Sequence, residues 1–67
     1  MNVPKWTGSL IGKMHNHKVS KSELAEKLGF TPEYVSMVLN GKKEPKGAEE
    51  KFNQALNEII EEKGGAL

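Results

Sequence analysis

The sequence predicts an all-α domain, a small bundle of four helices, or of five if the last segment is divided. Short stretches of Gly, Pro and Asn separate four segments, and each repeats its apolar residues with the spacing of an amphipathic helix. No segment sustains the two-residue alternation of a strand. A chain of 67 residues is long enough for only one domain, which we expect over residues 1–67. The chain contains no cysteine, so the core of this domain must form without disulfides.

The first helix is predicted from about residue 4 to residue 16. Apolar side chains recur there at the spacing of one helix face, namely Trp6, Leu10, Ile11 and Met14. We expect Trp6 to lie in the core. Gly8 and Gly12 each cost about 1 kcal/mol relative to Ala in a helix interior, so packing must stabilise this helix more than propensity does.

The second helix is predicted over residues 21–28 and has the clearest start of the four. Ser20 and Glu23 have the spacing of a capping box, in which each side chain accepts a hydrogen bond from the backbone N–H of the other residue. Glu23 and Lys27 are four residues apart, so we also expect an ion pair along this helix.

The third helix is predicted over residues 32–40, after a turn of only three residues. Gly29 can take the positive φ that ends the second helix, and Thr31 is a good N-cap for the third. Phe30, inside this turn, is expected to pack inward against the third helix as a hydrophobic staple. An Asn-Gly dipeptide is the stop signal.

The last helix is predicted over residues 48–62. Its apolar stripe has helical spacing and consists of Ala48, Phe52, Ala55, Leu56, Ile59 and Ile60. A lysine-rich loop with one proline precedes this helix, and two glycines follow it. We expect residues 63–67 to be a frayed tail.

The charged residues are unevenly distributed along the chain. All ten basic residues are Lys and all nine acidic residues are Glu, which gives a net charge of +1. Residues 1–47 carry eight Lys and four Glu, and residues 48–67 carry two Lys and five Glu, so the net charges of the two parts are +4 and −3. The chain is therefore basic in front and acidic behind, a bias that the total charge hides.

Two short helices joined by a three-residue turn that contains glycine form the pattern of a helix-turn-helix. Residues 21–43 carry it and read Lys-Ser-Glu-Leu-Ala-Glu-Lys-Leu-Gly-Phe-Thr-Pro-Glu-Tyr-Val-Ser-Met-Val-Leu-Asn-Gly-Lys-Lys. In its Leu-Ala…Leu-Gly, Tyr-Val-Ser and Asn-Gly-Lys-Lys motifs, this stretch resembles the Cro/repressor-type, Xre-like helix-turn-helix family of bacteria and phages. The resemblance covers about residues 10–56 and implies a lambda-repressor-like DNA-binding fold.

By that resemblance the chain is expected to be a sequence-specific transcriptional regulator of a phage or mobile element, most simply a repressor. Its partner would be double-stranded DNA, with helix 32–40 docked in the major groove. The sequence departs from the family pattern in two ways. It has no Arg, and one longer helix follows the motif where the family has two short ones.

The solvent face of helix 32–40 carries the side chains that could contact base edges. On a helical wheel it lies opposite the apolar positions and contains Glu33, Ser36, Met37 and Asn40. Asn can bond an adenine edge, Met can touch a thymine methyl, and Glu can accept from cytosine N4. Without Arg, no side chain can make the Arg–guanine fork, so guanine would be read by Lys or not at all. Two of these residues have an alternative to base contact. Glu33 would only interact favourably with the helix dipole, and Met37 would pack in the core.

Phosphate contacts are expected from the first turns of both motif helices and from the loop that follows them. The candidates are Lys21, Ser22, Thr31, Tyr34, Lys42, Lys43 and Lys46. Tyr34 has an alternative role in bracing the bundle. Useful specificity calls for a dimer on two half-sites. We expect its contact on helix 48–62 and the C-terminal tail, at Ile59, Ile60, Ala66 and Leu67, together with Val3.

Two other functions stay open at this point. A protein-interaction module, such as an antirepressor or a regulatory subunit, would keep the bundle without binding DNA, and the missing Arg favours it. A recombination accessory factor similar to excisionases would use the same DNA face but bend DNA in arrays. Footprints over several adjacent sites would point to that factor.

An enzyme, a cofactor and a metal site are not expected. The sequence has no Asp, no Cys and no Gly-rich phosphate loop. His15 and His17 have no third metal ligand in sight. No apolar run is long enough to cross a membrane, so we expect a cytoplasmic protein without a membrane partner.

Overall fold

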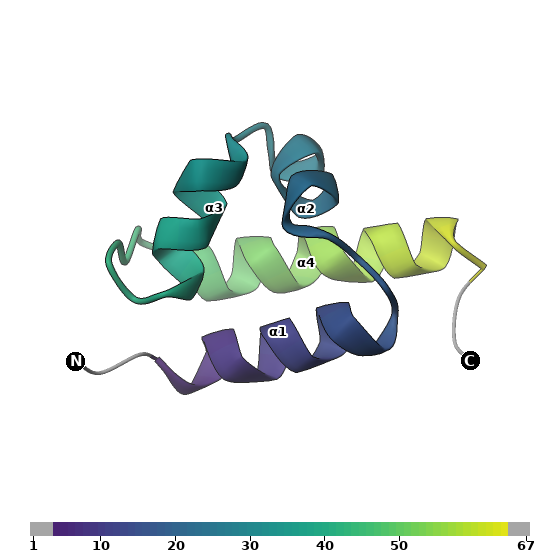
Figure 1. Ribbon diagram of the computed structural model, residues 1–67, viewed down its shortest axis with the longest axis horizontal. Coiled ribbons are helices and arrows are strands. Elements are labelled where there is room, and N and C mark those ends of the chain that lie inside the picture. The colour runs from purple at the N-terminus through teal and green to yellow at the C-terminus, as the bar shows by residue number, and fades with distance from the viewer. Residues whose placement is uncertain (1–3, 65–67) are drawn as a thin grey trace.

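The structure is a computed structural model, and it describes residues 4–64. This part of the chain folds into four helices joined by short loops (Figure 1). They are α1 (Lys5–Asn16), α2 (Lys21–Leu28), α3 (Pro32–Leu39) and α4 (Ala48–Glu62). The all-α fold class is confirmed, and the last segment is a single helix rather than two. Two ends differ by one residue from the prediction. Pro4 is the N-cap of α1 rather than part of it, and Asn40 is the C-cap of α3.

The two longer helices, α1 and α4, run side by side in the same direction, and α2 and α3 lie above them (Figure 1). α2 packs against both α3 and α4, and α1 packs against α4 and α3. The core lies between these helices. Leu24, Val35 and Leu56 are completely buried within it.

The inward face of α1 differs from the predicted one. Thr7 is completely buried, and its hydroxyl donates a hydrogen bond of 2.7 Å to the carbonyl oxygen of Pro4. Ile11, predicted on the inward face, is 41% exposed. Since successive residues of a helix are about 100° apart, Thr7, Leu10 and Met14 form the inward stripe and Ile11 falls at its edge.

The four aromatic side chains of the sequence contact one another in a row. Ring-centroid distances are 5.7 Å for Trp6–Phe52, 6.5 Å for Phe52–Phe30 and 4.9 Å for Phe30–Tyr34. Phe52 is 1% exposed, whereas Trp6 is only half-buried at the end of the row. Trp6 therefore lies at the rim of the core, and its prediction as a core residue is corrected accordingly.

Three of the helices end with the same pair of backbone hydrogen bonds. The residue that follows each helix end takes a left-handed φ, at Lys18 (57°), Gly29 (80°) and Gly41 (80°). Its own N–H bonds the carbonyl three residues earlier, and the next N–H bonds the carbonyl five residues earlier. Glycine is the usual residue here, so two of the ends follow from the sequence, whereas Lys18 gives no such signal.

The predicted ion pair between Glu23 and Lys27 is wrong. Lys27 reaches across to α4, where it donates a hydrogen bond to Glu62 and lies 3.7 Å from a carboxylate oxygen of Glu58. Glu23 pairs with Lys63 at 3.1 Å, while its other oxygen completes the predicted capping box. Lys27 thus has two carboxylates of α4 within reach. Glu23, the other residue of the predicted pair, contacts Lys63 in the turn that follows α4.

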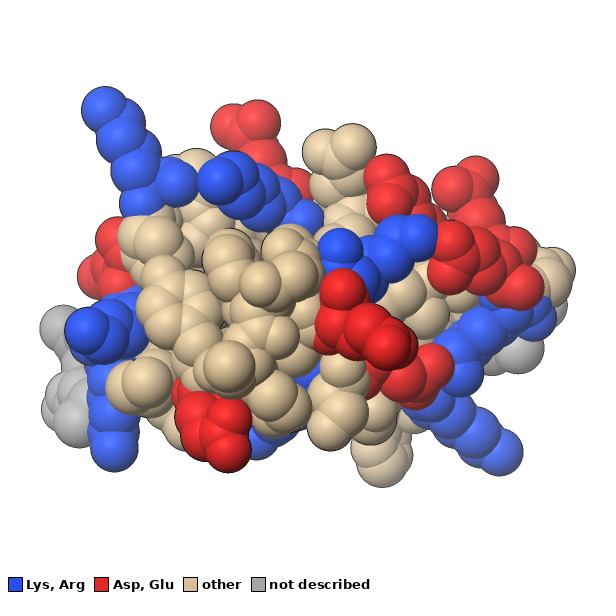
Figure 2. Space-filling model, turned by 90° about the horizontal axis from the view of Figure 1, so that it is seen from above, with Lys and Arg blue, Asp and Glu red and all other residues tan. Residues whose placement is uncertain are grey.

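Acidic side chains concentrate at one end of the molecule. Seen from above, most of the red atoms lie over α2 and the C-terminal half of α4, with lysines between them (Figure 2). The other end, over α3 and the loop that follows it, shows mainly uncharged atoms in its centre, with lysines around them and scattered glutamates. This bias between the two ends is not the bias along the sequence, because α2 belongs to the basic first part of the chain and the first turn of α4 lies at the opposite end from its last.

Candidate nucleic-acid interface

Capping and packing together determine which side of α3 is exposed. Thr31 caps the helix by accepting a hydrogen bond of 3.1 Å from the N–H of Tyr34, and Pro32 occupies its first turn. One side of the helix is at most 1% exposed and consists of Val35, Val38 and Leu39. Because the core holds this side, the opposite side of α3 is free to meet a partner.

The four predicted base-contact residues lie on the side of α3 that the core leaves free. Glu33 and Asn40 are exposed, and Ser36 and Met37 are half-buried. Asn40 Nδ2 donates a hydrogen bond of 3.3 Å to Ser36 Oγ. This bond leaves the side-chain carbonyl of Asn40 as an acceptor and the hydroxyl of Ser36 as a donor. The pair can therefore present one donor and one acceptor to a base edge.

The loop after α3 is tied to the end of the helix through Met37. The carbonyl of Met37 accepts hydrogen bonds from the backbone N–H groups of Lys42 and Lys43, at 2.9 and 3.4 Å. Met37 lies outside the core cluster, so it does not take the core role that was left open for it. The side chains of Lys42, Lys43 and Lys46 are exposed. The backbone bonds anchor the first two of these lysines beside the last turn of α3.

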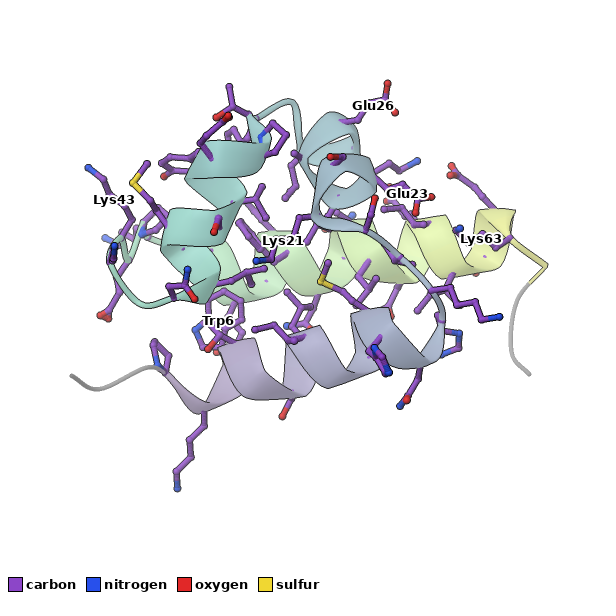
Figure 3. All side chains as sticks on the ribbon, in the orientation of Figure 1. Trp6, Lys21, Glu23, Glu26, Lys43 and Lys63 are labelled. Atoms are coloured by element: carbon purple, nitrogen blue, oxygen red, sulfur yellow. The ribbon has the colours of Figure 1, made fainter. Side chains whose placement is uncertain are left out.

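Lysines stand on both sides of α3. Figure 3 shows Lys43 on the side away from α2 and Lys21 on the side toward α2. Lys21 also lines a shallow hollow of about 180 Å³ with Leu39 of α3. Together with exposed Ser22, it forms the first turn of α2, where the leading N–H groups have no partner inside the helix. An anionic backbone on either side of α3 would meet positive charge.

The comparison with known families agrees with this geometry. The matching family model is described as helix-turn-helix and covers residues 15–49, more than half of the chain. The chain belongs to the Cro/C1-type helix-turn-helix family. It is thus a DNA-binding regulator by family. No curated protein and no solved structure matches the chain.

The family match coincides with the candidate interface. It begins near the end of α1 and ends in the first turn of α4, so it includes both motif helices and the lysine-rich loop. Of the predicted phosphate contacts of this helix-turn-helix protein, only Tyr34 is half-buried. The exposed ones are Lys21, Ser22, Thr31, Lys42, Lys43 and Lys46.

Tyr34 and Phe30 form a feature that sequence reasoning missed. Tyr34 packs against the core and contacts Phe30 edge-on, so it has the bracing role that was left open for it. Phe30, predicted to pack inward, is 38% exposed. With Gly29 and Thr31 these two rings line an open hollow of about 460 Å³ beside the first turn of α3. Periodicity alone does not distinguish a ring that covers the core from a ring inside it.

The predicted dimer contact needs correction. Ile59 and Ile60 are only 5% and 8% exposed, because both belong to the core of their own chain. They are therefore not available to a partner. Val3, Ala66 and Leu67, the other residues of that prediction, lie outside the described residues.

Within residues 4–64, no three side chains of His or Glu are grouped so that they could hold a metal ion. His15 is exposed and His17 is half-buried. The family is one of DNA-binding domains rather than of enzymes. Over the same residues, each helix is too short or too polar to cross a membrane.

Proposed function

We propose that this helix-turn-helix protein is a repressor of a phage or mobile element and acts by occupying an operator, with α3 in the major groove. The observation that carries the proposal is the exposed side of α3, with Lys21 on one side of it and Lys43 on the other. Phosphates on both walls of the groove would then meet a lysine. Ser22, Thr31 and Lys42 would add further backbone contacts.

The exposed side of α3 favours some bases over others. Asn40 and Ser36 would contact adenine, Met37 would contact a thymine methyl, and Glu33 would accept from cytosine N4. No cationic side chain belongs to this set, so guanine would be read only by lysines at the edges. We therefore expect an operator whose half-sites are rich in A, T and C on the strand that α3 reads.

Selection from a library of genomic fragments tests this proposal directly. Asn40→Ala is expected to weaken preferred sites more than random DNA, and Lys43→Ala is expected to weaken both equally. Gln54→Ala on α4 removes an exposed amide far from α3 in sequence and serves as the matched control. Absence of any DNA binding at low salt would contradict the proposal.

Glu33 allows a sharper version of the same experiment. Its carboxylate repels phosphate but would accept a hydrogen bond from cytosine, so Glu33→Gln should bind random DNA more tightly and tolerate more bases at one operator position. If Glu33 only stabilises the helix dipole, the variant gains non-specific affinity without a change in the selected sequence. Comparing the two selected sequence sets distinguishes these roles.

Two further measurements address the other candidate functions. NMR shift changes centred on α4, with α3 silent to DNA, would favour the protein-interaction module. Footprints that extend over several adjacent sites would favour the excisionase-like factor.

A further inference from the structure

The shallow hollow of about 180 Å³ beside Lys21 lies where α1, the loop that follows it, α2 and α3 meet. We call it the α1–α3 hollow. Its lining residues are Ile11, Met14, His15, Val19, Lys21 and Leu39. Ile11 is 41% exposed and, with Phe30, is one of the two large apolar side chains that are exposed among the described residues. The α1–α3 hollow therefore has an apolar lining that the fold itself leaves partly uncovered.

The polar side chains of the α1–α3 hollow are basic. Lys21 and His15 are exposed, and among the described residues that line the hollow none is acidic. Lys21 begins α2, so the positive end of the dipole of that helix lies at the same place. The carboxylate of this turn, Glu23, is engaged by the N–H of Ser20 and by Lys63. An apolar lining with cationic side chains beside it is complementary to a ligand with an aliphatic chain and an anionic group.

Three other hollows on the described residues lack this combination. The one that Trp6 lines has three glutamates in its walls. A second hollow sets Lys27 among three glutamates. The third, lined by Phe30 and Tyr34, has no charged side chain among its described lining residues. An anionic ligand with an apolar chain therefore fits the α1–α3 hollow better than it fits these three.

We propose that the α1–α3 hollow binds a short aliphatic carboxylate, whose chain lies against Ile11 and Leu39 and whose carboxylate pairs with Lys21. The imidazole of His15 can donate a hydrogen bond to the same carboxylate. A hollow of about 180 Å³ has the volume of about six water molecules at roughly 30 Å³ each. It therefore has room for a chain of about five or six carbons. Hexanoate has this size and serves as the probe.

The carboxylate and DNA would use the same lysine, an argument that rests on the proposed function. Lys21 is a candidate phosphate contact beside α3, so a carboxylate paired with its ammonium group takes the place of that phosphate. The ligand can lower the affinity for DNA only by as much as this contact contributes. The α1–α3 hollow is thus an effector site, at which a small carboxylic acid weakens repression.

The hollow is shallow, so binding is weak and its dependence on chain length is the informative quantity. Complete burial of one methylene raises affinity about fourfold. From acetate through butanoate to hexanoate, the affinity should therefore rise at least about twofold per methylene and reach a Kd on the order of millimolar. Chains longer than hexanoate should gain little more, because the hollow is then full.

NMR titrations of the whole chain without DNA test the site. Hexanoate should shift the amide signals of the residues that line the hollow, and hexylammonium should not, because Lys21 repels it. Lys21→Ala should weaken hexanoate binding about twofold to fivefold. Ile11→Ala should weaken it at least about threefold, because the variant removes part of the apolar wall. Lys5→Ala, at an exposed lysine in the first turn of α1, is the matched control.

Fluorescence anisotropy with the selected operator tests the competition. Hexanoate at three times its Kd should weaken DNA binding by up to about fourfold. Acetate at the same concentration supplies the same ionic strength and should have a smaller effect. Ile11→Ala removes none of the proposed DNA contacts, so it should bind DNA as tightly as the wild type and lose most of the response to hexanoate.

Several outcomes would overturn the proposal. They are signal shifts that do not centre on the α1–α3 hollow, an affinity that does not depend on chain length, equal binding of hexylammonium, and a control variant as damaging as Lys21→Ala. Hexanoate that binds there but weakens DNA binding no more than acetate does would overturn the effector role. Melting curves show whether a variant has lost its fold, and the two test variants lie on different helices, so one can stand without the other.

The two proposals can fail separately. A chain that binds hexanoate as described but binds no DNA contradicts the proposed function alone. A chain that binds DNA but not hexanoate contradicts the carboxylate site alone.

Discussion

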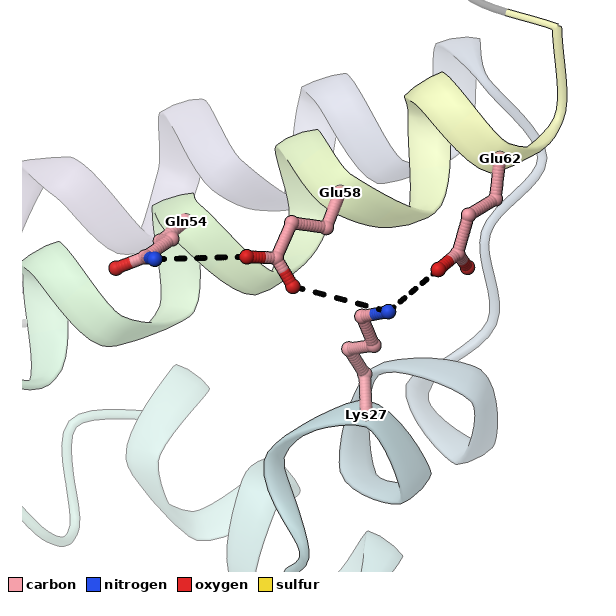
Figure 4. A network of polar contacts seen from close by, with 4 residues as sticks. All are labelled: Lys27, Gln54, Glu58 and Glu62. Atoms are coloured by element: carbon pink, nitrogen blue, oxygen red, sulfur yellow. Dashed lines mark hydrogen bonds and ion pairs between the residues drawn. The ribbon is translucent and has the colours of Figure 1, made fainter.

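Lys27 of α2 donates a hydrogen bond to Glu62 of α4 and lies 3.7 Å from Glu58, so one ammonium group bridges two turns of the neighbouring helix (Figure 4). Gln54 extends this contact by donating to Glu58 at 3.4 Å. On the same side of α2, Glu23 pairs with Lys63. These contacts fasten the first helix of the motif to α4 by charge as well as by apolar packing.

The bridge predicts how stability depends on pH. The hydrogen bond with Glu62 raises the pKa of Lys27 above its ordinary value of 10.5. The contribution of the Lys27 ion pair to stability is therefore complete below pH 10.5, and it is lost as the pH rises through the raised pKa of Lys27. The hydrogen bond from the Ser20 backbone, together with Lys63, lowers the pKa of Glu23 below 4.5. The contribution of the charged Glu23 carboxylate to stability is complete above pH 4.5, and it is lost as the pH falls through the lowered pKa of Glu23.

Replacing Lys27 by Met should therefore lower the Tm near neutral pH by a few degrees and make it less sensitive to salt. The difference from the wild type should disappear above the raised pKa of Lys27. Calorimetric scans across pH measure this. Lys51→Met is the matched control, since none of the ion pairs found within residues 4–64 involves Lys51. A difference that persists at high pH would show that the bridge is not its cause.

Lys18 offers a way to stabilise the protein. A non-glycine residue in the left-handed region costs about 1–2 kcal/mol, and a new glycine gives back part of that gain by making the unfolded chain more flexible. We expect Lys18→Gly to raise the free energy of unfolding by roughly 0.5–1 kcal/mol in urea titrations. Lys18→Ala removes the same charge but keeps the strained φ. If the alanine variant gains as much as the glycine variant, the strain is not the reason.

The capping box at the start of α2 is open to a similar test. Ser20 Oγ accepts from the Glu23 N–H at 3.1 Å, and the Glu23 carboxylate accepts from the Ser20 N–H at 3.0 Å. Ser20→Ala should lower the free energy of unfolding by about 1 kcal/mol. Ser9→Ala, at an exposed position inside α1, should leave it unchanged or raise it slightly, because alanine is the better helix former. Equal effects at the two serines would contradict the capping role.

The proposed DNA contacts predict the salt dependence of binding. If each copy neutralises about four phosphates, the slope of log K against log salt should be near −3.6 per copy. Lys43→Ala should reduce the size of that slope by about 1. Lys63→Ala, at the end of the molecule away from α3 (Figure 3), should leave the slope unchanged. A slope near zero for the wild type would exclude phosphate contacts as the main source of affinity.

The sequence was sufficient for the motif because its signals are local. Gly29, Thr31 and the Ser20–Glu23 box act within a few residues, so the bounds of α2 and the turn follow from them. The apolar positions of α3 also follow, since Val35, Val38 and Leu39 share one side of a single helix. These same positions indicated the opposite side as the candidate DNA face.

The remaining features depend on contacts between distant segments. Lys27 has a suitable partner on its own helix, but folding brings two carboxylates of α4 closer to it. Thr7 is buried and Ile11 is exposed because the inward stripe of α1 is set by its packing against α4 and α3. Ile59 and Ile60 illustrate the same limit. An apolar stripe in a sequence does not reveal whether it packs in the core of its own chain or against a partner.

The shared ending of α1, α2 and α3 has a consequence for the kinetics of folding. The hydrogen bonds that end these three helices span at most five residues. The C-terminal ends of α1, α2 and α3 can therefore form before distant segments of the chain come into contact. Chains rich in such local contacts fold on the microsecond to millisecond scale. Temperature-jump experiments followed by Trp6 fluorescence should find a single phase in that range, fast enough for the motif to form as soon as its last helix has left the ribosome.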